Sequence, residues 1–168
     1  MARSTSFWRP MTRDDLAAVL AIADQVHADF PEDLAVFAER QRLYSAGAYI
    51  LESQGEVRGY LLSHPWHSGD PPALNSLLGS LPELADTFYI HDLALLPSER
   101  GTGMAGTIIQ QIAAHAKEQG FATISLVAVN DSNSFWQRFG FSADETPEGL
   151  WRARSYGEGA RLMRRLLI

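Results

Sequence analysis

FYIHDLALLPSERGTGMAGTIIQQIAAHAKEQGFATISLVAVNDSNSFWQRFGF, the stretch from Phe88 to Phe141, decides the fold. The apolar run 88–96 predicts a strand, and a glycine-rich turn leads from it into an amphipathic helix over about 103–119. The next run, 122–129, is almost continuously apolar, which is typical of a strand buried on both faces. Free backbone N–H groups and the positive end of the helix dipole gather where the helix begins. The turn therefore predicts a site for a phosphate-bearing ligand.

The rest of the chain predicts further elements on either side of this stretch. They are an edge strand at 7–11, a helix from the capping box of Thr12 and Asp15 to about 27, a second helix over 34–47, a hairpin over 48–63, and tail strands near 150–154 and 160–167.

The segment 64–87 is rich in proline and glycine, and a connection this long inside a domain is usually functional or mobile. The spacing of its leucines predicts a short helix that packs part of it down. These leucines are Leu74, Leu77, Leu78 and Leu81. We place no domain boundary in this segment, so residues 1–168 are predicted to form one domain.

The composition argues against several classes of site and of binding partner. The 168 residues include no cysteine, which excludes disulfides, thiolate metal sites and a cysteine nucleophile. A net charge of -6 argues against a nucleic-acid-binding surface. No apolar run is long enough to span a membrane, and the first residues lack a signal-peptide core, so we predict a cytoplasmic protein without a membrane partner. His64 and His67 have a metal-like spacing but no third ligand, so we predict no metal site.

The glycines of the turn have two interpretations. Gly101, Gly103 and Gly106 spell GxGxxG between a strand and a helix, which is the fingerprint of NAD(P)-dependent oxidoreductases. Four residues, 97–100, separate strand and glycines, however, and only one strand–helix–strand unit is present, so a doubly wound sheet cannot be built. A P-loop is excluded because no lysine follows the glycines.

The second interpretation begins at Arg100, since residues 100–105 fit R-x-x-G-x-A and a guanidinium beside free N–H groups suits a pyrophosphate. With the strand before it and the closing W-x-x-x-G-F at 136–141, the stretch 88–141 resembles the GNAT family of N-acetyltransferases. The resemblance implies an α/β fold in which a mixed, strongly bent sheet has helices on both sides. It also implies a direct attack of a primary amine on acetyl-CoA, with 88–141 as the core that binds acetyl-CoA.

By the same resemblance, acetyl-CoA lies between two splayed central strands. The main chain of the first strand would bind the pantetheine arm and polarise the thioester, the turn would bind the pyrophosphate, and two asparagines would contact the far pantetheine amide. The residues in these roles are Leu93, Ala94 and Leu95; Arg100, Gly101, Thr102, Gly103, Met104 and Ala105; and Asn130 and Asn133. Trp136 occupies the position where family members commonly place a tyrosine that protonates the leaving thiolate.

The proposed chemistry needs a base for the amine and an acid for the thiolate. For the base we favour His91 with Asp92 behind it, because a histidine pKa lies near working pH; the alternative is a satisfied strand residue. Strict strand parity would place His91 and Asp92 on opposite faces, but the family that the stretch resembles tends to have a bulge here, so we do not rely on parity across this strand. The acid stays open between water, Tyr156 and Tyr89, or catalysis is weak.

Several alternatives remain open at this stage. The chain could be a module that binds CoA without catalysis, and the acceptor could be a small molecule or a peptide amine. The family often dimerises, so a homodimer is also open. The cluster Asp24, Asp29, Glu32, Asp33 and Glu39 would suit a cationic amine, although a solvated acidic surface is the favoured interpretation. The side chains around Trp66 either line the acceptor side or fill a small local core. His27 and His115 are assigned to the surface.

Overall fold

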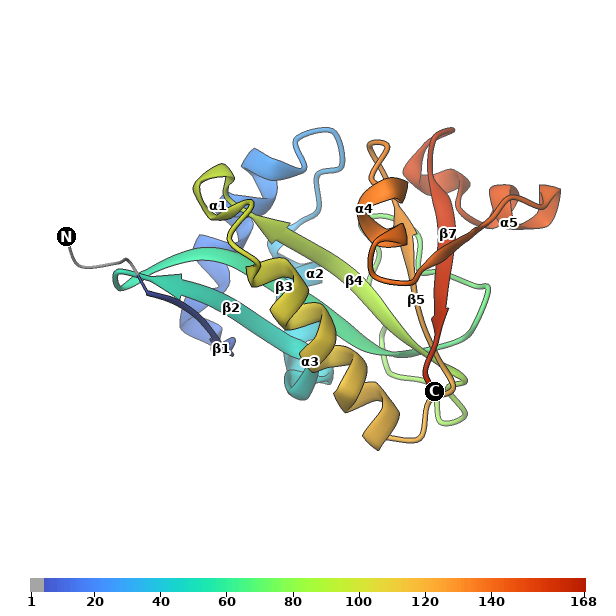
Figure 1. Cartoon of the computed structure of the whole chain (residues 1–168), viewed down its shortest axis with the longest axis horizontal. Coiled ribbons are helices and arrows are strands. Elements are labelled where there is room, and N and C mark those ends of the chain that lie inside the picture. The colour runs from blue at the N-terminus through green and yellow to red at the C-terminus, as the bar shows by residue number, and fades with distance from the viewer. Residues whose placement is uncertain (1–4) are drawn as a thin grey trace.

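Two neighbouring strands, β4 (Thr87–Leu95) and β5 (Thr123–Ala128), form the parallel centre of a sheet in the computed structural model, which describes residues 5–168. The seven strands of this sheet follow the order β1-β2-β3-β4-β5-β7-β6, and all other neighbouring pairs are antiparallel (Figure 1). The sequence therefore predicted the mixed α/β architecture correctly.

The remaining elements surround these two strands. The strands are β1 (Ser6–Pro10), β2 (Ala48–Ser53), β3 (Glu56–Trp66), β6 (Ser142–Asp144) and β7 (Arg161–Leu166), and the helices are α1 (Leu16–Val26), α2 (Leu34–Leu43), α3 (Met104–Glu118), α4 (Asn133–Gln137) and α5 (Pro147–Arg152).

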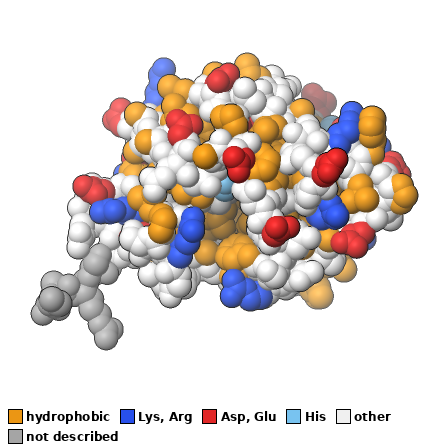
Figure 2. All heavy atoms as spheres, turned by 90° about the horizontal axis from the view of Figure 1, so that it is seen from above, with side chains coloured by type: hydrophobic (Ala, Val, Ile, Leu, Met, Phe, Trp, Pro, Cys, Tyr) orange, Lys and Arg blue, Asp and Glu red, His pale blue; other side chains and the backbone are white. Residues whose placement is uncertain are grey.

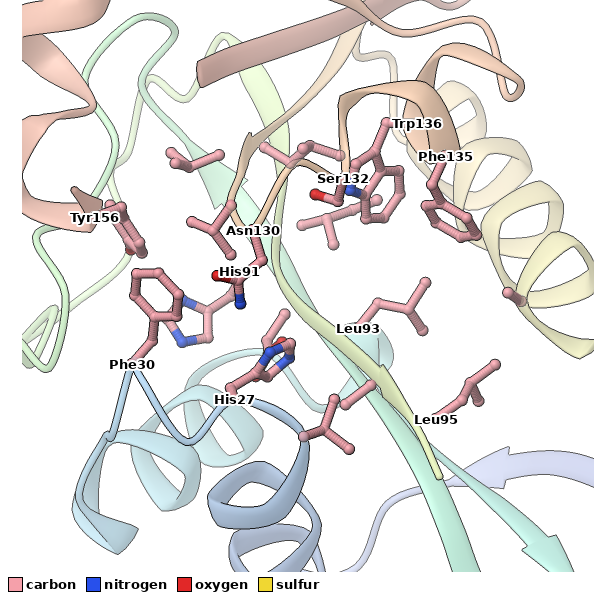
Figure 3. A pocket seen from close by; sticks show the side chains of 18 of the residues that line it. His27, Phe30, His91, Leu93, Leu95, Asn130, Ser132, Phe135, Trp136 and Tyr156 are labelled. Atoms are coloured by element: carbon pink, nitrogen blue, oxygen red, sulfur yellow. The ribbon is translucent and has the colours of Figure 1, made fainter. Parts of the chain in front are cut away.

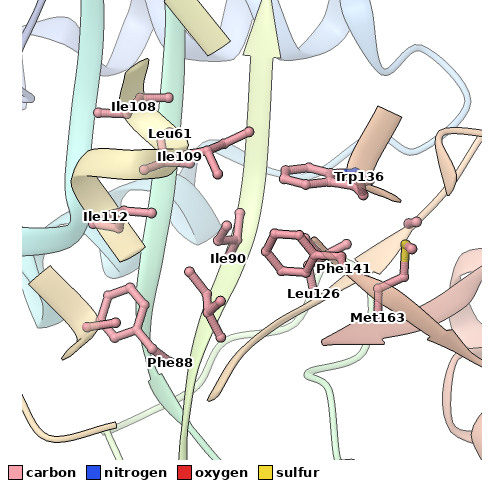
Figure 4. Close-up of a cluster of buried hydrophobic side chains, with 13 residues drawn as sticks. Leu61, Phe88, Ile90, Ile108, Ile109, Ile112, Leu126, Trp136, Phe141 and Met163 are labelled. Atoms are coloured by element: carbon pink, nitrogen blue, oxygen red, sulfur yellow. The ribbon is translucent and has the colours of Figure 1, made fainter. Parts of the chain in front are cut away.

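Helices cover both faces of the sheet. On one face, Ile108, Ile109 and Ile112 of α3 pack with Trp136 of α4 against β4 and β5 (Figure 4). On the other face, α1 and α2 bury Val19 and other apolar residues against β2 and β3. The periodicity of the α3 stripe predicted this burial, because residues three and four apart share one helix face.

The predicted capping box of Thr12 and Asp15 begins a single 3-10 turn, Arg13–Asp15, that leads directly into α1. The N–H of Thr12 donates to Asp15 Oδ2 at 2.7 Å, and the N–H of Asp15 closes the turn by donating to the Thr12 carbonyl at 3.0 Å. Arg9 from β1 forms an ion pair with the same carboxylate at 2.8 Å. Burial raises the pKa of Asp15 less than the Arg9 hydrogen bond lowers it, so the carboxylate that orders this helix start stays ionised.

The two central strands separate part-way along their length. They pair from Phe88 beside Ile124 to Ile90 beside Leu126, and the ladder ends there although both strands continue. Within residues 5–168, the edge of β4 beyond Ile90 therefore has no strand beside it on the β5 side. Such an edge carries free N–H and C=O groups.

Two predicted elements are wrong. Residues 67–86 contain no helix, because Pro71, Pro72 and Pro82 remove backbone donors and the segment is held by hydrogen bonds to other elements instead. The predicted strand at 150–154 overlaps α5, which begins with Pro147 and is capped by the Thr146 hydroxyl accepting from the Gly149 N–H at 3.1 Å.

Candidate active site

A cavity of about 600 Å³ opens where β4 and β5 separate (Figure 3). Its walls come from the end of α1, the loop before α2, β4, the start of α3, β5 and α4. Figure 2 shows this face hollowed near its centre, with a histidine and hydrophobic side chains inside the hollow and basic side chains near its rim. The cavity therefore joins the predicted anion site to the predicted catalytic strand.

Most of the residues predicted for the site line this cavity. They are His91, Asp92, Leu93, Ala94, Leu95, Arg100, Gly101, Ala105, Asn130 and Trp136. The other predicted residues do not line the cavity. They are Tyr89, which is buried, Thr102 and Gly103, which are exposed, and Met104 and Asn133, which are half-buried.

The turn before α3 has the geometry of an anion-binding loop. Gly101 and Gly103 have φ of +76° and +85°, a region that glycine enters without strain, and Gly103 is the N-cap of α3. The Thr102 hydroxyl donates to the Glu99 carbonyl at 2.6 Å, and the Trp8 indole donates to the Met104 carbonyl at 2.8 Å. These contacts fix the loop, so the first N–H groups of α3 are held in place at the cavity.

Two arginine side chains line the cavity at the end where α3 begins, which we call the arginine end. The side chains of Arg100 and Arg138 both line it, and neither forms an ion pair among residues 5–168. Arg138 lies over the ring of Phe135, with its guanidinium carbon 5.5 Å from the ring centroid. Arg138 was not predicted as a site residue, although it falls inside the closing W-x-x-x-G-F pattern.

A β-bulge places His91. Leu62 pairs with Asp92 and Ser63 with Ile90, so His91 has no partner in the register. Beyond the bulge the strand changes face, and His91 and Asp92 both reach groups on the α1–α2 side. Strict alternation along the strand therefore fails at this point.

His91 forms a buried pair with Glu32. Its Nε2 lies 2.9 Å from Glu32 Oε1, and the two side chains are 1% and 7% exposed. Burial raises the pKa of Glu32, but His91 and the N–H of Asn75 outweigh it and lower that pKa. An ionised carboxylate only accepts, so Nε2 carries the proton of this hydrogen bond and Nδ1 is the other ring nitrogen. This Nδ1 is buried and has no partner among residues 5–168.

Asp92 forms a second pair, with His27 rather than with His91. Asp92 Oδ1 lies 2.8 Å from His27 Nε2, and Oδ2 accepts from the Tyr60 hydroxyl. Burial lowers the pKa of His27, but Asp92 and the Leu93 main chain raise it above the usual value of 6.5. Burial likewise opposes ionisation of Asp92, yet His27, His91 and Tyr60 hold the pKa of Asp92 below its usual range. These contacts therefore favour the protonated form of His27 beside β4.

The sequence did not identify His27 or Glu32, the partners of Asp92 and His91, as site residues. His27 lines the cavity with a side chain 21% exposed, so its assignment to the surface is wrong. A signal was present, because His27 follows Ala23 by four residues and Leu20 by seven on the apolar stripe of α1. Glu32 was counted among solvated acids, and only the fold brings it to β4.

Tyr89 and Tyr156, the two hydroxyls considered as acids, differ in position. Tyr89 is 2% exposed and stacks on His64, with ring centroids 5.6 Å apart. Tyr156 lines the cavity and donates to the Pro72 carbonyl at 2.9 Å. Burial raises the pKa of both hydroxyls and lowers that of His64 to about 3, so all three groups are neutral near pH 7.

Trp136, Asn130 and Asn133 come from the segment after β5 and from α4. Trp136 is 8% exposed and packs edge-on against Phe135 and Phe141, with centroids 5.1 and 5.4 Å away. Asn130 has φ of +52° and directs its side chain into the cavity beside His91 (Figure 3). Asn133 begins α4 outside the cavity wall.

Comparison with protein families decides the identity of this arrangement. The model of the Acetyltransferase (GNAT) family matches residues 13–141. The chain belongs to this family. The NAD(P)-dependent oxidoreductase interpretation is therefore not favoured. No curated protein sequence matches the chain well enough to narrow its activity further.

Solved structures of similar fold span more than one reaction. Ard1 from Thermoplasma volcanium is 16% identical with a TM-score of 0.73, over 97% of this chain and 98% of that one. The GNAT-like decarboxylase GphF, in complex with isobutyryl-CoA, is 14% identical with a TM-score of 0.77, over 96% and 100%. The ribosomal-protein-S18-alanine N-acetyltransferase from Escherichia coli is 16% identical with a TM-score of 0.67, over 97% and 94%. At this identity the likeness shows the fold, and the reaction must be argued from the site.

None of the helices in residues 5–168 is both long and apolar enough to cross a membrane. Within the same residues, no group of three or more histidine, aspartate or glutamate side chains is placed to hold a metal ion.

Proposed function

We propose that this chain is an acetyl-CoA-dependent N-acetyltransferase that acts on a primary amine by direct attack, with residues 1–168 as one catalytic domain. One observation carries the proposal. A single cavity connects two arginines without ion pairs in residues 5–168, Arg100 before α3 and Arg138 at the end of α4, to a buried histidine whose Nδ1 lacks a partner there, along a free strand edge.

The residues present fit acetyl-CoA, which supplies an acetyl group activated as a thioester. Arg100, Arg138 and the N–H groups of 101–105 offer the positive charge and donors that a pyrophosphate needs. The main chain of 93–95 offers hydrogen bonds to the pantetheine amides, as an added strand would. Asn130 would serve the far amide, and the Trp136 ring offers an apolar wall, whereas Asn133 lies outside the cavity and is not part of this assignment. The isobutyryl-CoA held by one protein of the same fold supports this assignment.

His91 is the proposed general base. Because Glu32 holds the proton at Nε2, Nδ1 is free to take a proton from the acceptor ammonium, and the resulting imidazolium is stabilised by the buried carboxylate. Asp92 is proposed to hold His27, the second histidine of the cavity, in place through their ion pair. Tyr89 would contribute only through Tyr156, with which it shares a hydrogen bond.

Trp136 has no acidic hydroxyl, so it cannot protonate the leaving thiolate as a tyrosine could. Another group must therefore stabilise the negative charge of the thiolate. A protonated His27 lines the cavity beside the Leu93 main chain, and its positive charge would stabilise the negative charge that develops there. Tyr156 is less suited because its hydroxyl already donates to Pro72 and burial raises its pKa.

Thermal shift with four ligands tests the proposal. Acetyl-CoA and CoA should stabilise the protein by an amount that grows with the logarithm of the ligand concentration above the Kd, whereas NAD and NADP should not. Release of free CoA thiol in the presence of amines then separates an enzyme from a binding module. Stabilisation by NAD alone would overturn the proposal, and tight CoA binding without turnover of any amine would leave the binding module.

A further inference from the structure

The cavity has a second end beyond His91, away from the arginines, and its lining there is apolar. Phe30 and Tyr156 flank His91 and Asn130 at this end, while Leu93 and Leu95 lie toward the other (Figure 3). The apolar residues that complete this end are Leu74, Val127 and Val129. If acetyl-CoA occupies the arginine end, as proposed, the acceptor amine must enter from here.

The carboxylates at this end already have hydrogen-bond or ion-pair partners within the protein. Glu32 accepts from His91 and from the N–H of Asn75 at 3.0 Å, and its side chain is 7% exposed. Asp92 is held by His27 and Tyr60. Behind the wall, the fully buried cation of Arg40 adds positive potential toward Glu32. A second positive charge on the acceptor would thus lose its hydration without gaining a free anion, and such burial is costly.

The proline-rich segment 67–86 contributes Leu74 to the apolar wall at this end of the cavity, and hydrogen bonds to other elements hold the segment in place. Glu39 of α2 accepts from the N–H groups of Leu78 at 2.6 Å and Gly79 at 3.0 Å. Arg40 Nη1 donates to the Ser76 carbonyl at 3.0 Å. On the opposite side, the Tyr156 hydroxyl donates to the carbonyl of Pro72. The segment is therefore tied to α2 and to the C-terminal region, with Leu74 between these ties facing the cavity.

From this wall we infer that the acceptor is a small primary amine carried on an uncharged alkyl or aryl group, and that Leu74 helps to select it against polycationic amines. The inference rests on the proposed acetyltransferase function and deepens it. The acidic cluster read from the sequence as suited to a cationic substrate does not supply a free carboxylate to the cavity.

Matched amines of equal length test the inference. Hexylamine and 1,6-diaminohexane differ only in the second ammonium, and the kcat/KM for hexylamine should be higher by about 10-fold or more, because the second charge must be desolvated. Phenethylamine should also be used, whereas spermidine should not. Equal or better use of 1,6-diaminohexane would overturn the inference while leaving the acetyltransferase function intact.

Leu74→Glu sharpens the test. A carboxylate on the wall should shift the preference toward 1,6-diaminohexane by several-fold, without changing CoA affinity. Leu77→Glu is the matched control, since Leu77 belongs to the same segment, is 61% exposed and does not line the cavity. An unchanged preference in Leu74→Glu would count against the inference.

Binding measurements test the inference even if turnover is too slow to compare the two amines. With CoA bound, hexylamine should lower the intrinsic fluorescence of the wild-type protein or raise its melting temperature, and 1,6-diaminohexane should do so less. If CoA binds and hexylamine does not, the inference is wrong. If neither CoA nor acetyl-CoA binds, the proposed function itself fails, so the two failures are distinguishable.

Discussion

The two ends of the cavity are built in different ways. Most of the arginine end comes from one contiguous run, 93–105, in which a strand edge, a turn and a helix start follow one another, and Arg138 from the end of α4 completes it. The acceptor end combines residues that are far apart in the chain, from Phe30 and Glu32 through Leu74 and His91 to Tyr156. A local site can be recognised from a short pattern, whereas a dispersed site exists only after the sheet has formed.

The two ends should also respond differently to substitution. The arginine end offers backbone groups and helix geometry, which tolerate many side chains. The acceptor end depends on pairs such as His91–Glu32 and His27–Asp92, where one substitution leaves a buried group unpaired. Substitutions at the two ends should therefore have separable effects on binding and on turnover.

The largest effect is expected from His91→Ala. Loss of a general base typically lowers the rate by about 10²–10⁴-fold, and the arginine end should keep its CoA affinity. Single-turnover acetylation and CoA titration measure the two quantities separately. Because the substitution leaves Glu32 without its partner, His91→Ala/Glu32→Gln should be folded and equally slow. A rate within a few-fold of wild type would remove His91 as the base.

Arg100→Ala should raise the Kd for CoA by about 10-fold or more, since hydrogen bonds to charged groups contribute about 1.5–3 kcal/mol. The free energy of unfolding should change little, because Arg100 is exposed and forms no ion pair within the described part of the chain. Arg42→Ala is a matched control, since Arg42 is exposed on α2 and does not line the cavity. Isothermal titration at two salt concentrations measures the effect, and an unchanged Kd would contradict the pyrophosphate assignment.

The same contrast explains how much the sequence predicts. The strand at 88–96, the turn and the helix at 103–119 were placed within a residue or two, because each has a local signal in periodicity or glycine spacing. The bulge at His91 has no such signal in a single sequence, and it decides which way His91 and Asp92 face.

Partners from distant segments were the harder part. Asp92 was paired with His91, although it binds His27 from the end of α1. Glu32 was treated as one of several solvated acids, although the loop before α2 buries it. Both errors arise because a charged residue in a loop resembles a surface residue until the fold supplies its partner.

Glycine substitutions should separate backbone strain from ligand binding. Gly101→Ala and Gly120→Ala both place a side chain at positive φ, +76° and +87°, with no neighbour within 4 Å of the new Cβ. Each should lower the free energy of unfolding by about 1–2 kcal/mol, measured by urea denaturation. Only Gly101→Ala should also weaken CoA binding, because Gly101 orients the N–H groups at the cavity. Equal effects of the two substitutions on CoA binding would contradict the local origin of that site.

The smallest effect concerns the pH dependence of stability at the His27–Asp92 pair. The pKa of His27 is raised above 6.5, so its protonated ring stabilises the folded state below that pH, and this contribution is lost as the pH rises through the raised value. The pKa of Asp92 is lowered, so its contribution is present above the usual value of 3.8 and is lost as the pH falls through the folded value. His27→Gln should therefore be destabilising at pH 5.5 and less so at pH 9, as measured by urea denaturation. His67→Gln, which has no ion pair in residues 5–168, should show no such difference. A pH-independent effect of His27→Gln would mean that His27 is uncharged, and the charge proposed beside the Leu93 main chain would have to come from another group.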